Sequence, residues 1–181
     1  ILCCRNFLHN TEGTALIDHI EHNNISWKRL YILSDAHRVR PIVYGQLAPF
    51  KEKIGEGNLR ELRDASVYFN AFAMSNKREL MRLLQLLSAG KISAHAFKGI
   101  EFAENIYGNL SGREFSDNDI IISQADIPEV IELMAAEGYH SKDVEFYTRF
   151  PGQYIRDYKD LHFEKMNGGV REFAVEFHFK P

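Results

Sequence analysis

The spacing of hydrophobic residues changes near residue 90, and this change limits the fold more than any other feature of the chain. From Asn58 to Ala89 most hydrophobic residues recur every three or four positions, which is typical of one face of an α-helix. Beyond Gly90, short segments alternate hydrophobic and polar residues, as half-buried β-strands do. We therefore expect an α+β fold, with a helical region at residues 1–90 and strands mixed with helices at residues 91–181.

Caps and prolines set the expected helix ends in the first region. Thr11 is expected to cap a first helix, residues 25–39 form a second, and Pro41 suits the first turn of a third. Gly90 is a natural end for the long helix. The hydrophobic stripe on that helix predicts packing against a neighbouring element rather than a cofactor site.

The second region is expected to hold strands and short helices in alternation. Strands are expected at residues 92–99, 116–123, 153–166 and 171–180, helices at 100–108 and 126–138, and a loop near 150–155. Asp126 is the expected cap of the second helix and Gly138 its end. The sequence "NGG" between the last two strands predicts a β-hairpin.

Composition and charge exclude several classes of protein. A hydrophobic fraction of 45% is enough for a packed core, and no hydrophobic run approaches the ~20 residues of a membrane helix, so we expect no membrane partner. The net charge of −3 divides into +5 over residues 1–98 and −8 over residues 99–181. The acidic half argues against a broad nucleic-acid surface.

The N-terminal segment indicates a compartment. Cys3 and Cys4 are the only cysteines and are adjacent, so no disulfide framework is expected and a reducing cytoplasm is predicted. The opening "ILCCRNFL" lacks the features of a signal peptide. The absence of an initiating Met predicts a processed or trimmed chain.

Two carboxylates precede the most hydrophobic strand, in "SDNDIII". Residues two apart on a strand point to the same side, which would place Asp117 and Asp119 together with Cα atoms about 6.6 to 6.8 Å apart. Such a pair repels unless a cation lies between its members, and a hard divalent ion such as Mg²⁺ prefers oxygen ligands. Glu176 on the last strand offers a third carboxylate, and His178 points the same way. Alone, the two aspartates would be better explained as a solvated strand edge than as a metal site.

A strand also ends at Lys98 and Gly99, directly before a helix. A glycine there lets a phosphate approach the backbone, and the N-terminus of a helix favours an anion. Lys98 can supply a positive charge to the same group. Taken separately, this junction is common and carries little weight.

Together these residues resemble the uncharacterised bacterial nucleotidyltransferase family of the DNA polymerase beta superfamily. The resemblance covers nearly the whole chain, including the N-terminal helices. It rests on an ordered set: Lys98-Gly99, Tyr107, Arg113, Asp117 and Asp119, Gly138-Tyr139, and Val175 to Phe179.

The resemblance implies a mixed β-sheet with flanking helices, on which the helical region packs. It also implies a reaction that moves a nucleoside monophosphate from a nucleoside triphosphate to the hydroxyl or phosphate of an unknown acceptor. Asp117, Asp119 and Glu176 would hold Mg²⁺ or Mn²⁺ and carry the catalysis. The residues expected to contact the nucleotide are Lys98, Gly99, Arg113 and His178.

Two departures from the family pattern keep other functions open. Ile100 follows Gly99 where the superfamily usually has Gly or Ser, and Asn118 replaces the usual hydrophobic residue between the aspartates. A degenerate module that binds a nucleotide or a protein partner without catalysis is the first alternative. A metal-dependent phosphohydrolase that directs the same carboxylates at water is the second.

Several questions stay open at this level. Arg113 suits a phosphate contact and an ion pair with Glu114 equally well, and His162 faces either the site or solvent. The nucleotide, the acceptor, the oligomeric state and any extension beyond Pro181 are not set by the sequence.

Overall fold

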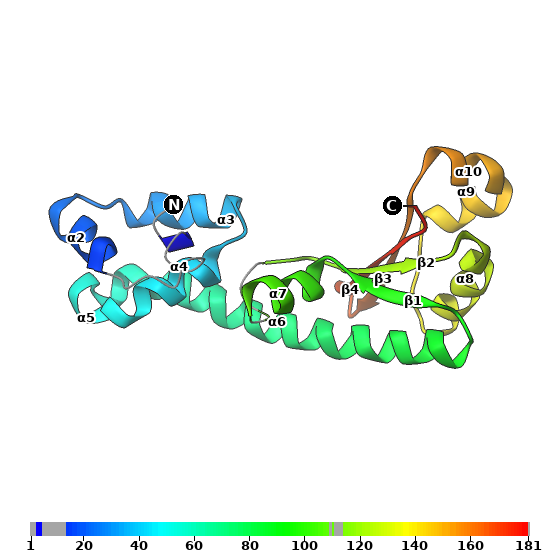
Figure 1. Cartoon of the computed structure of the whole chain (residues 1–181), viewed down its shortest axis with the longest axis horizontal. Helices are drawn as coiled ribbons and strands as arrows, with labels where there is room; N and C mark the ends of the chain where they lie inside the picture. Colours follow the sequence, from blue (N-terminus) through cyan, green and yellow to red (C-terminus); the bar gives the residue numbers. More distant parts are fainter. Residues whose placement is uncertain (1–2, 5–13, 109, 111–113, 181) are drawn as a thin grey trace. The chain divides into compact units, whose positions relative to one another are not determined.

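The computed structural model describes residues 3–4, 14–108, 110 and 114–180. They form two compact units, one from Ile1–Met74 with Ala103–Phe115 and the other from Ser75–Phe102 with Ser116–Pro181. Helices α6, Glu56–Ala89, and α7, Gly99–Tyr107, are labelled in Figure 1. By residue range, each contributes to both units. The expected domain division at residue 90 stays a prediction, and the last turns of α6 belong to the same unit as the β-sheet.

The first unit is helical, as predicted. Its remaining elements are α2 (Thr14–His22), α3 (Trp27–Ala36), α4 (Arg40–Leu47), the 3₁₀ turn η1 (Ala48–Phe50) and α5 (Lys51–Ile54). Ser26 caps α3 by accepting a hydrogen bond from the backbone N–H of Arg29, and Pro41 lies in the first turn of α4. Thr11, the expected cap of the first helix, lies outside the described residues. Among the described helices, none is both long enough and apolar enough to cross a membrane.

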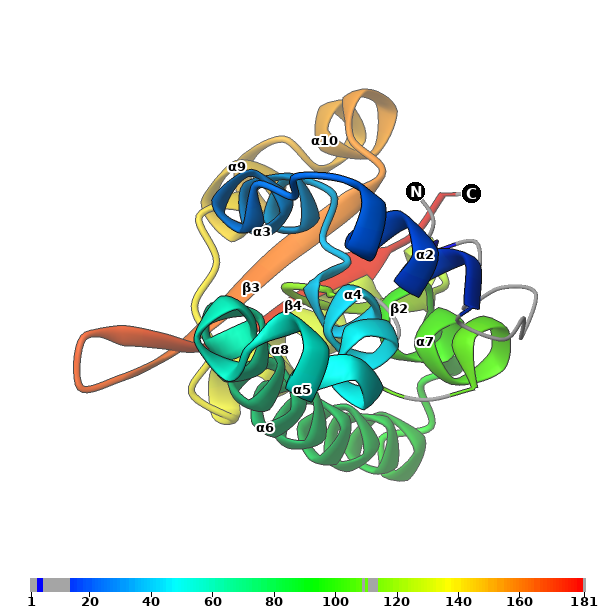
Figure 2. The same cartoon turned by 90° about the vertical axis from the view of Figure 1, so that its left-hand side faces the viewer.

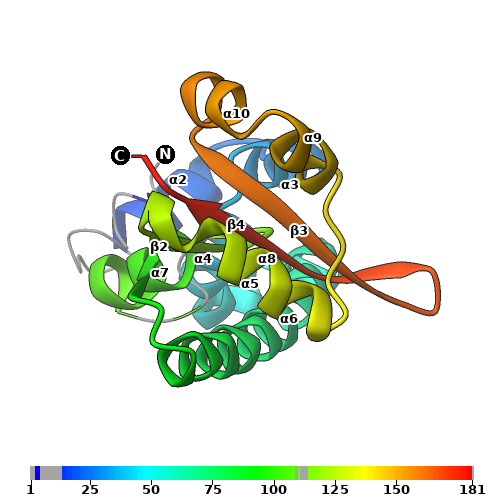
Figure 3. The same cartoon turned by 90° about the vertical axis from the view of Figure 1, so that its right-hand side faces the viewer.

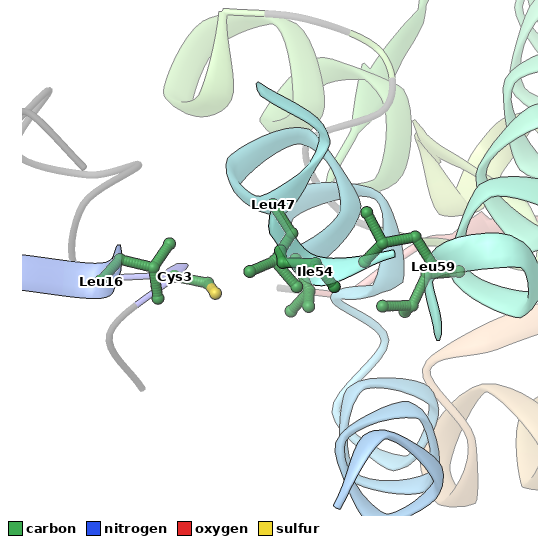
Figure 4. Close-up of a cluster of buried hydrophobic side chains, with 7 residues drawn as sticks. Cys3, Leu16, Leu47, Ile54 and Leu59 are labelled. Carbon is green, nitrogen blue, oxygen red and sulfur yellow. The ribbon is translucent and has the colours of Figure 1, made fainter. Parts of the chain in front are cut away.

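Hydrophobic side chains from these helices form one buried cluster (Figure 4). Its members are Cys3, Leu16, Val43, Leu47, Ile54, Leu59 and Leu62. Burial raises the pKa of the Cys3 thiol to about 11, so this cysteine is a packing residue rather than a nucleophile. Cys3 and Cys4 are both free thiols.

The second unit contains a four-stranded mixed sheet. Its strands are β1 (Ala94–Phe97), β2 (Asn118–Ile122), β3 (Asp160–Asn167) and β4 (Val170–His178), in the order β1-β2-β4-β3. Strands β2 and β4 are parallel, and the two outer pairings are antiparallel. The predicted hairpin joins β3 to β4 through Gly168 and Gly169, which both have positive φ. Because β2 pairs only with the end of β4, the hairpin extends beyond β2 (Figure 2).

The sheet has one apolar face. Its buried side chains are Ile120, Ile122, Leu161, Phe163, Val175 and Phe177. Asn118 shares this face and donates a hydrogen bond of 3.3 Å to the backbone oxygen of Asn76, which places α6 against it. Helix α8, Ile127–Ala136, adds buried side chains such as Met134 to the core of this unit. Polar side chains are therefore left to the opposite face of the sheet.

An ionic cluster ties α6 to the segment after α8. Arg82 bridges the carboxylates of Glu79 and Glu137, and the hydroxyl of Tyr139 donates a hydrogen bond of 2.8 Å to Glu79. Tyr139 is buried, as is Glu79. The cluster satisfies a carboxylate that would otherwise be buried without a partner.

The start of α8 differs in detail from the prediction. Asp126 is its N-cap residue but makes no capping hydrogen bond with its side chain. A 3₁₀ turn, η2 (Gln124–Asp126), precedes the helix, and Ser123 caps that turn by accepting from the backbone N–H of Ala125. Gly138, with φ of 79°, ends the helix as expected.

The prediction for residues 151–157 is wrong. Helix α10 spans Pro151–Asp157 and so replaces most of the expected loop and the first part of the expected strand; it follows helix α9, Asp143–Arg149. Pro151 occupies the first turn of α10, where its missing N–H costs no hydrogen bond. Tyr154 is buried within a cluster of aromatic rings, so tertiary packing favours the helix.

Strand β3 lies at one edge of the sheet (Figure 3). Its backbone forms hydrogen bonds with side chains and a short β-bridge. The carboxylate of Asp143 accepts a hydrogen bond of 2.9 Å from the backbone N–H of His162, and the hydroxyl of Tyr154 donates one of 2.8 Å to the backbone oxygen of Asp160. His140 pairs with Glu164 in an isolated β-bridge. These contacts fix β3 and protect its edge from pairing with another chain.

Candidate functional site

Three polar side chains form a row across the polar face of the sheet. Asp119 on β2 lies directly opposite Glu176 on β4, and Glu176 lies opposite His162 on β3. Directly paired residues of neighbouring strands point to the same face, so this register gathers the three side chains. The structure thereby brings together Asp119 and Glu176, which the sequence placed on separate strands.

His178 lies among the carboxylates of this face. Its Nε2 atom is 2.7 Å from Oδ1 of Asp119 and 3.6 Å from Oε2 of Glu176, and its Nδ1 atom is 3.6 Å from Oδ2 of Asp160. The imidazole is buried, with the ring of Phe97 edge-on to it at a centroid distance of 5.7 Å. His178 is therefore fixed in place and orients Asp119.

The pairing of β3 with β4 places His162 on the polar face of the sheet. The sequence had left open whether His162 faces the site or solvent. Its Nδ1 atom is 3.6 Å from Oε1 of Glu176, and its Nε2 atom is 3.1 Å from Oδ1 of Asp160. Asp160 itself was missed by the sequence analysis. It lies two residues before His162 and so shares its face, but that pattern becomes visible only once the start of β3 is known.

The local charges change two protonation equilibria. Burial raises the pKa of Glu176, and the negative charges of Asp117, Asp119 and Asp160 raise it further against the opposing effect of His162. Burial lowers the pKa of His162, but its hydrogen bond to Asp160 and the charge of Glu176 outweigh this and leave the pKa above its ordinary value. A carboxylate with a raised pKa among other carboxylates is a common feature of functional sites.

Asp117 lies just outside the strand in which it was expected. Strand β2 begins at Asn118, and Asp117 occupies a bend immediately before it. Its carboxylate accepts a hydrogen bond of 3.1 Å from the hydroxyl of Ser116. Its charge still raises the pKa of Glu176, so the site includes Asp117 electrostatically.

The turn between β1 and α7 lies against these carboxylates. Lys98 and Gly99 both have positive φ, 55° and 32°, a conformation that favours glycine and strains a lysine. A Cβ atom on Gly99 would lie 3.4 Å from the backbone oxygen of Asp117 and 3.7 Å from Oδ2 of Asp119. The ammonium of Lys98 is 3.8 Å from Oδ1 of Asp119. Strained backbone of this kind persists where the surroundings enforce it, which is frequent at ligand sites.

The structure accommodates Ile100, one of the two departures from the family pattern, better than Asn118, the other. Ile100 is buried in the first turn of α7, so its side chain is a core residue rather than an obstruction at the turn. Asn118 faces away from Asp119, as expected, and is only 1% exposed. Its Oδ1 atom has no hydrogen-bond partner among the residues that the structure describes. The amide is therefore a poor fit to the apolar face.

Arg113, expected at the nucleotide, lies outside the described residues. Its neighbour Glu114 is engaged by another arginine, because Arg40 donates hydrogen bonds to it from both the backbone and the guanidinium. Asp35 and Tyr31 also contact this guanidinium. Glu114 thus has a structural partner of its own within the helical unit.

The donor atoms on the polar face suit a divalent cation. Asp119, Glu176 and His178 offer ligand atoms that all lie within 4.8 Å of one another, and Asp160, His162 and Glu176 form a second such group. Carboxylate oxygens suit Mg²⁺ and Mn²⁺. Because His178 is hydrogen-bonded to Asp119, it can serve as an orienting partner while the oxygens remain for the ion.

Comparison with known proteins gives one family. A family model described as "Uncharacterised nucleotidyltransferase" matches residues 23–181, most of the chain. No curated protein and no solved structure matches the chain.

Proposed function

The chain belongs to this nucleotidyltransferase family, and from that premise we propose that it moves a nucleoside monophosphate from a nucleoside triphosphate to an acceptor hydroxyl or phosphate. Mg²⁺ or Mn²⁺ would be held by Asp117, Asp119 and Glu176. The observation that carries this proposal is the direct pairing of Asp119 with Glu176 across β2 and β4. This pairing places the carboxylates of β2 and β4 next to each other, beside the turn that ends in Gly99.

Each part of the site has a task in the transfer. A bound divalent cation would neutralise charge on the phosphates and favour attack at the α-phosphorus. Lys98 and the backbone at Gly99 would hold the triphosphate, since the charge and the absence of a side chain both suit an anion. His178 would keep Asp119 in position through their hydrogen bond.

The chemical balance of the step assigns a role to Glu176. The acceptor oxygen forms a bond to the α-phosphorus, and the bond from that phosphorus to the α–β bridging oxygen breaks, which releases pyrophosphate. For a hydroxyl acceptor, the lost proton passes to a nearby base. Glu176 suits this role because its carboxylate lies directly opposite Asp119 on the same face of the sheet.

Binding without catalysis is the second candidate. It is favoured by Ile100, because the position after Gly99 lacks the small residue usual in the superfamily. The burial of Ile100 weakens this objection, since its side chain packs in the core. The presence of Asp119 and Glu176 in one row favours catalysis.

Labelled triphosphates separate the candidate functions. Each of the four nucleoside triphosphates would be incubated with Mg²⁺ or Mn²⁺ and a pool of small metabolites, with the label at the α- or the γ-phosphate. Nucleotidyl transfer predicts α-label in a new product and γ-label in pyrophosphate. Release of γ-label as free phosphate would indicate a phosphohydrolase, and binding with no product from any triphosphate would indicate a binding module.

The proposed compartment is a reducing cytoplasm, and the two free cysteines support it. We propose a small molecule as the acceptor rather than a nucleic acid, because the acidic charge of residues 99–181 would repel a polyanion.

A further inference from the structure

A cavity of about 540 Å³ lies beside the row of carboxylates and has no role in the proposed binding of the triphosphate. One face of β3 lines it through Asp160, His162 and Glu164, and the segments around α9 and α10 line its other sides. Cavities of roughly 300 to 1,000 Å³ are typical of small-molecule sites. Its size therefore suits a compact ligand.

Two lining residues connect the cavity to the proposed reaction centre. His162 lies 3.6 Å from Glu176, measured from Nδ1 to Oε1, and Asp160 lies 3.6 Å from His178, measured from Oδ2 to Nδ1. Glu176 does not itself line the cavity, but a molecule bound against His162 would have one end a single side chain away from Glu176, the proposed proton acceptor. This is the position that an acceptor for the transfer requires.

The charges around the cavity select against anions. The carboxylates of Asp143 and Asp160 line it together with Lys142 and the imidazoles of His140 and His162, while the lining carboxylate of Glu164 is paired with Arg171 at 3.2 Å. Asp160 also adds to the negative field of the carboxylate row. A phosphorylated or carboxylated ligand would be repelled, whereas hydroxyl and amino groups could donate hydrogen bonds to these carboxylates.

An aromatic wall adds a second kind of contact. Tyr158 lines the cavity, is 48% exposed and stacks on Tyr154 with ring centroids 4.5 Å apart and planes 15° apart. Tyr154 is held in turn by its hydrogen bond to the backbone of Asp160. The electron-rich face of such a ring attracts C–H groups that bear hydroxyls, as on one side of a sugar ring.

We propose that this cavity binds the acceptor and that the acceptor is a small saccharide, either neutral or amine-bearing. The assignment as acceptor rests on the proposed nucleotidyl transfer. In that reaction a saccharide hydroxyl oxygen bonds to the α-phosphorus, pyrophosphate leaves with the α–β bridging oxygen, and the hydroxyl proton passes to Glu176. Saccharide binding itself requires neither metal nor nucleotide.

Three matched probes test the binding in the presence of a chelator. Saturation-transfer NMR would be recorded for the full chain with D-glucose, D-glucosamine and D-glucose 6-phosphate, which are respectively neutral, cationic and anionic. We expect saturation transfer to glucose and glucosamine, strongest for glucosamine, and at least about fivefold less to the phosphate. No signal from either unphosphorylated sugar, or the strongest signal from the phosphate, would overturn the proposal.

Variants of Tyr158 locate the binding. Tyr158→Ala should lower the saturation transfer at least about threefold, while Tyr158→Phe, which keeps the ring, should retain most of it. Tyr68→Ala is the matched control, because Tyr68 is an exposed tyrosine of α6 outside the cavity. An equal signal in wild type and Tyr158→Ala would place the sugar elsewhere. If saccharides bind but no triphosphate is consumed, the proposed nucleotidyl transfer is wrong and the cavity is still a saccharide site. If the protein transfers nucleotide to other molecules and binds no saccharide, only the saccharide assignment is wrong.

Discussion

Asp119 and Glu176 lie directly opposite each other on the parallel strands β2 and β4, 57 positions apart in the sequence but neighbours in the sheet. The hydrogen bond from His178 to Asp119 adds a third group to the same point. A pair of carboxylates held this close needs a positive partner, and Lys98 and His178 are the groups nearest to Asp119 among the described ion pairs. A divalent cation would meet the same need in the working enzyme.

The first prediction concerns Glu176. Glu176→Gln keeps the shape of the side chain but removes its charge and its capacity to take a proton. We expect the transfer rate to fall by about 10² to 10⁴-fold, with a much smaller change in nucleotide affinity. Single-turnover kinetics and equilibrium binding measure the two quantities separately.

Glu172→Gln provides the control for that prediction, because Glu172 is an exposed carboxylate of the same strand beyond the part paired with β2. It should leave the rate unchanged. A Glu176→Gln variant that transfers at the wild-type rate would remove Glu176 from the mechanism.

A second prediction concerns the turn at Gly99. Gly99→Val should lower triphosphate affinity by about tenfold or more, because the new side chain would occupy the approach to Asp117 and Asp119 and strain a residue with positive φ. Calorimetric titration with each triphosphate measures the change.

Gly57→Val is the comparison for Gly99→Val. Gly57 lies in α6, and a Cβ atom there would meet no atom of the described residues within 4 Å. This variant should bind the nucleotide as wild type does. Unchanged affinity in Gly99→Val would mean that the phosphates bind elsewhere.

A third prediction concerns the buried amide of Asn118. Asn118→Leu should raise the free energy of unfolding by about 1 kcal/mol, since it replaces an unsatisfied buried oxygen with a hydrocarbon of similar size. Asn118→Asp places a charge at the same position and should destabilise the protein. Urea unfolding followed by circular dichroism tests both signs, and a leucine variant less stable than wild type would show that the amide contributes a favourable contact.

A fourth prediction concerns pH and Glu79. The hydrogen bond from Arg82, followed by that from Tyr139, holds the pKa of Glu79 below its ordinary 4.5 despite its burial. A lowered pKa in the folded state stabilises the protein above pH 4.5, and this contribution is lost as the pH falls below 4.5 through the lowered value. The stability difference between wild type and Glu79→Gln should therefore shrink with acidification.

Urea midpoints at pH 7, 5, 4 and 3 would measure this difference, and a constant difference over that range would contradict the assignment. Tyr139→Phe should cost about 1 kcal/mol at neutral pH, because it removes one hydrogen bond to the same carboxylate.

The spacing of hydrophobic residues along the sequence predicted most of the fold. The long helix and the strands around Ile120 and Phe177 could be predicted because helices and strands place hydrophobic residues at different, recognisable intervals. The segment around Tyr154 could not be assigned in this way. Its alternation suits a strand, while the aromatic cluster that stabilises α10 comes from residues whose proximity the sequence does not reveal.

The same reasoning explains what was missed at the site. Alternation fixes the faces of Asp119, Glu176 and His178 because each follows or precedes a buried apolar residue on a clear strand. The face of Asp160 and His162 depends on where β3 begins, and α10 determines that point. The catalytic and binding roles of all these residues remain predictions.

The most direct test of the account is calorimetry of metal-dependent nucleotide binding to wild type and Asp119→Asn, with Asp157→Asn as a control at an exposed aspartate of α10. The account predicts that wild type and the control bind a triphosphate with Mg²⁺ or Mn²⁺, and that the affinity falls on addition of a chelator. Asp119→Asn should bind at least about tenfold more weakly while its circular dichroism spectrum matches that of wild type. Equal metal-dependent affinity in wild type and Asp119→Asn would contradict the account.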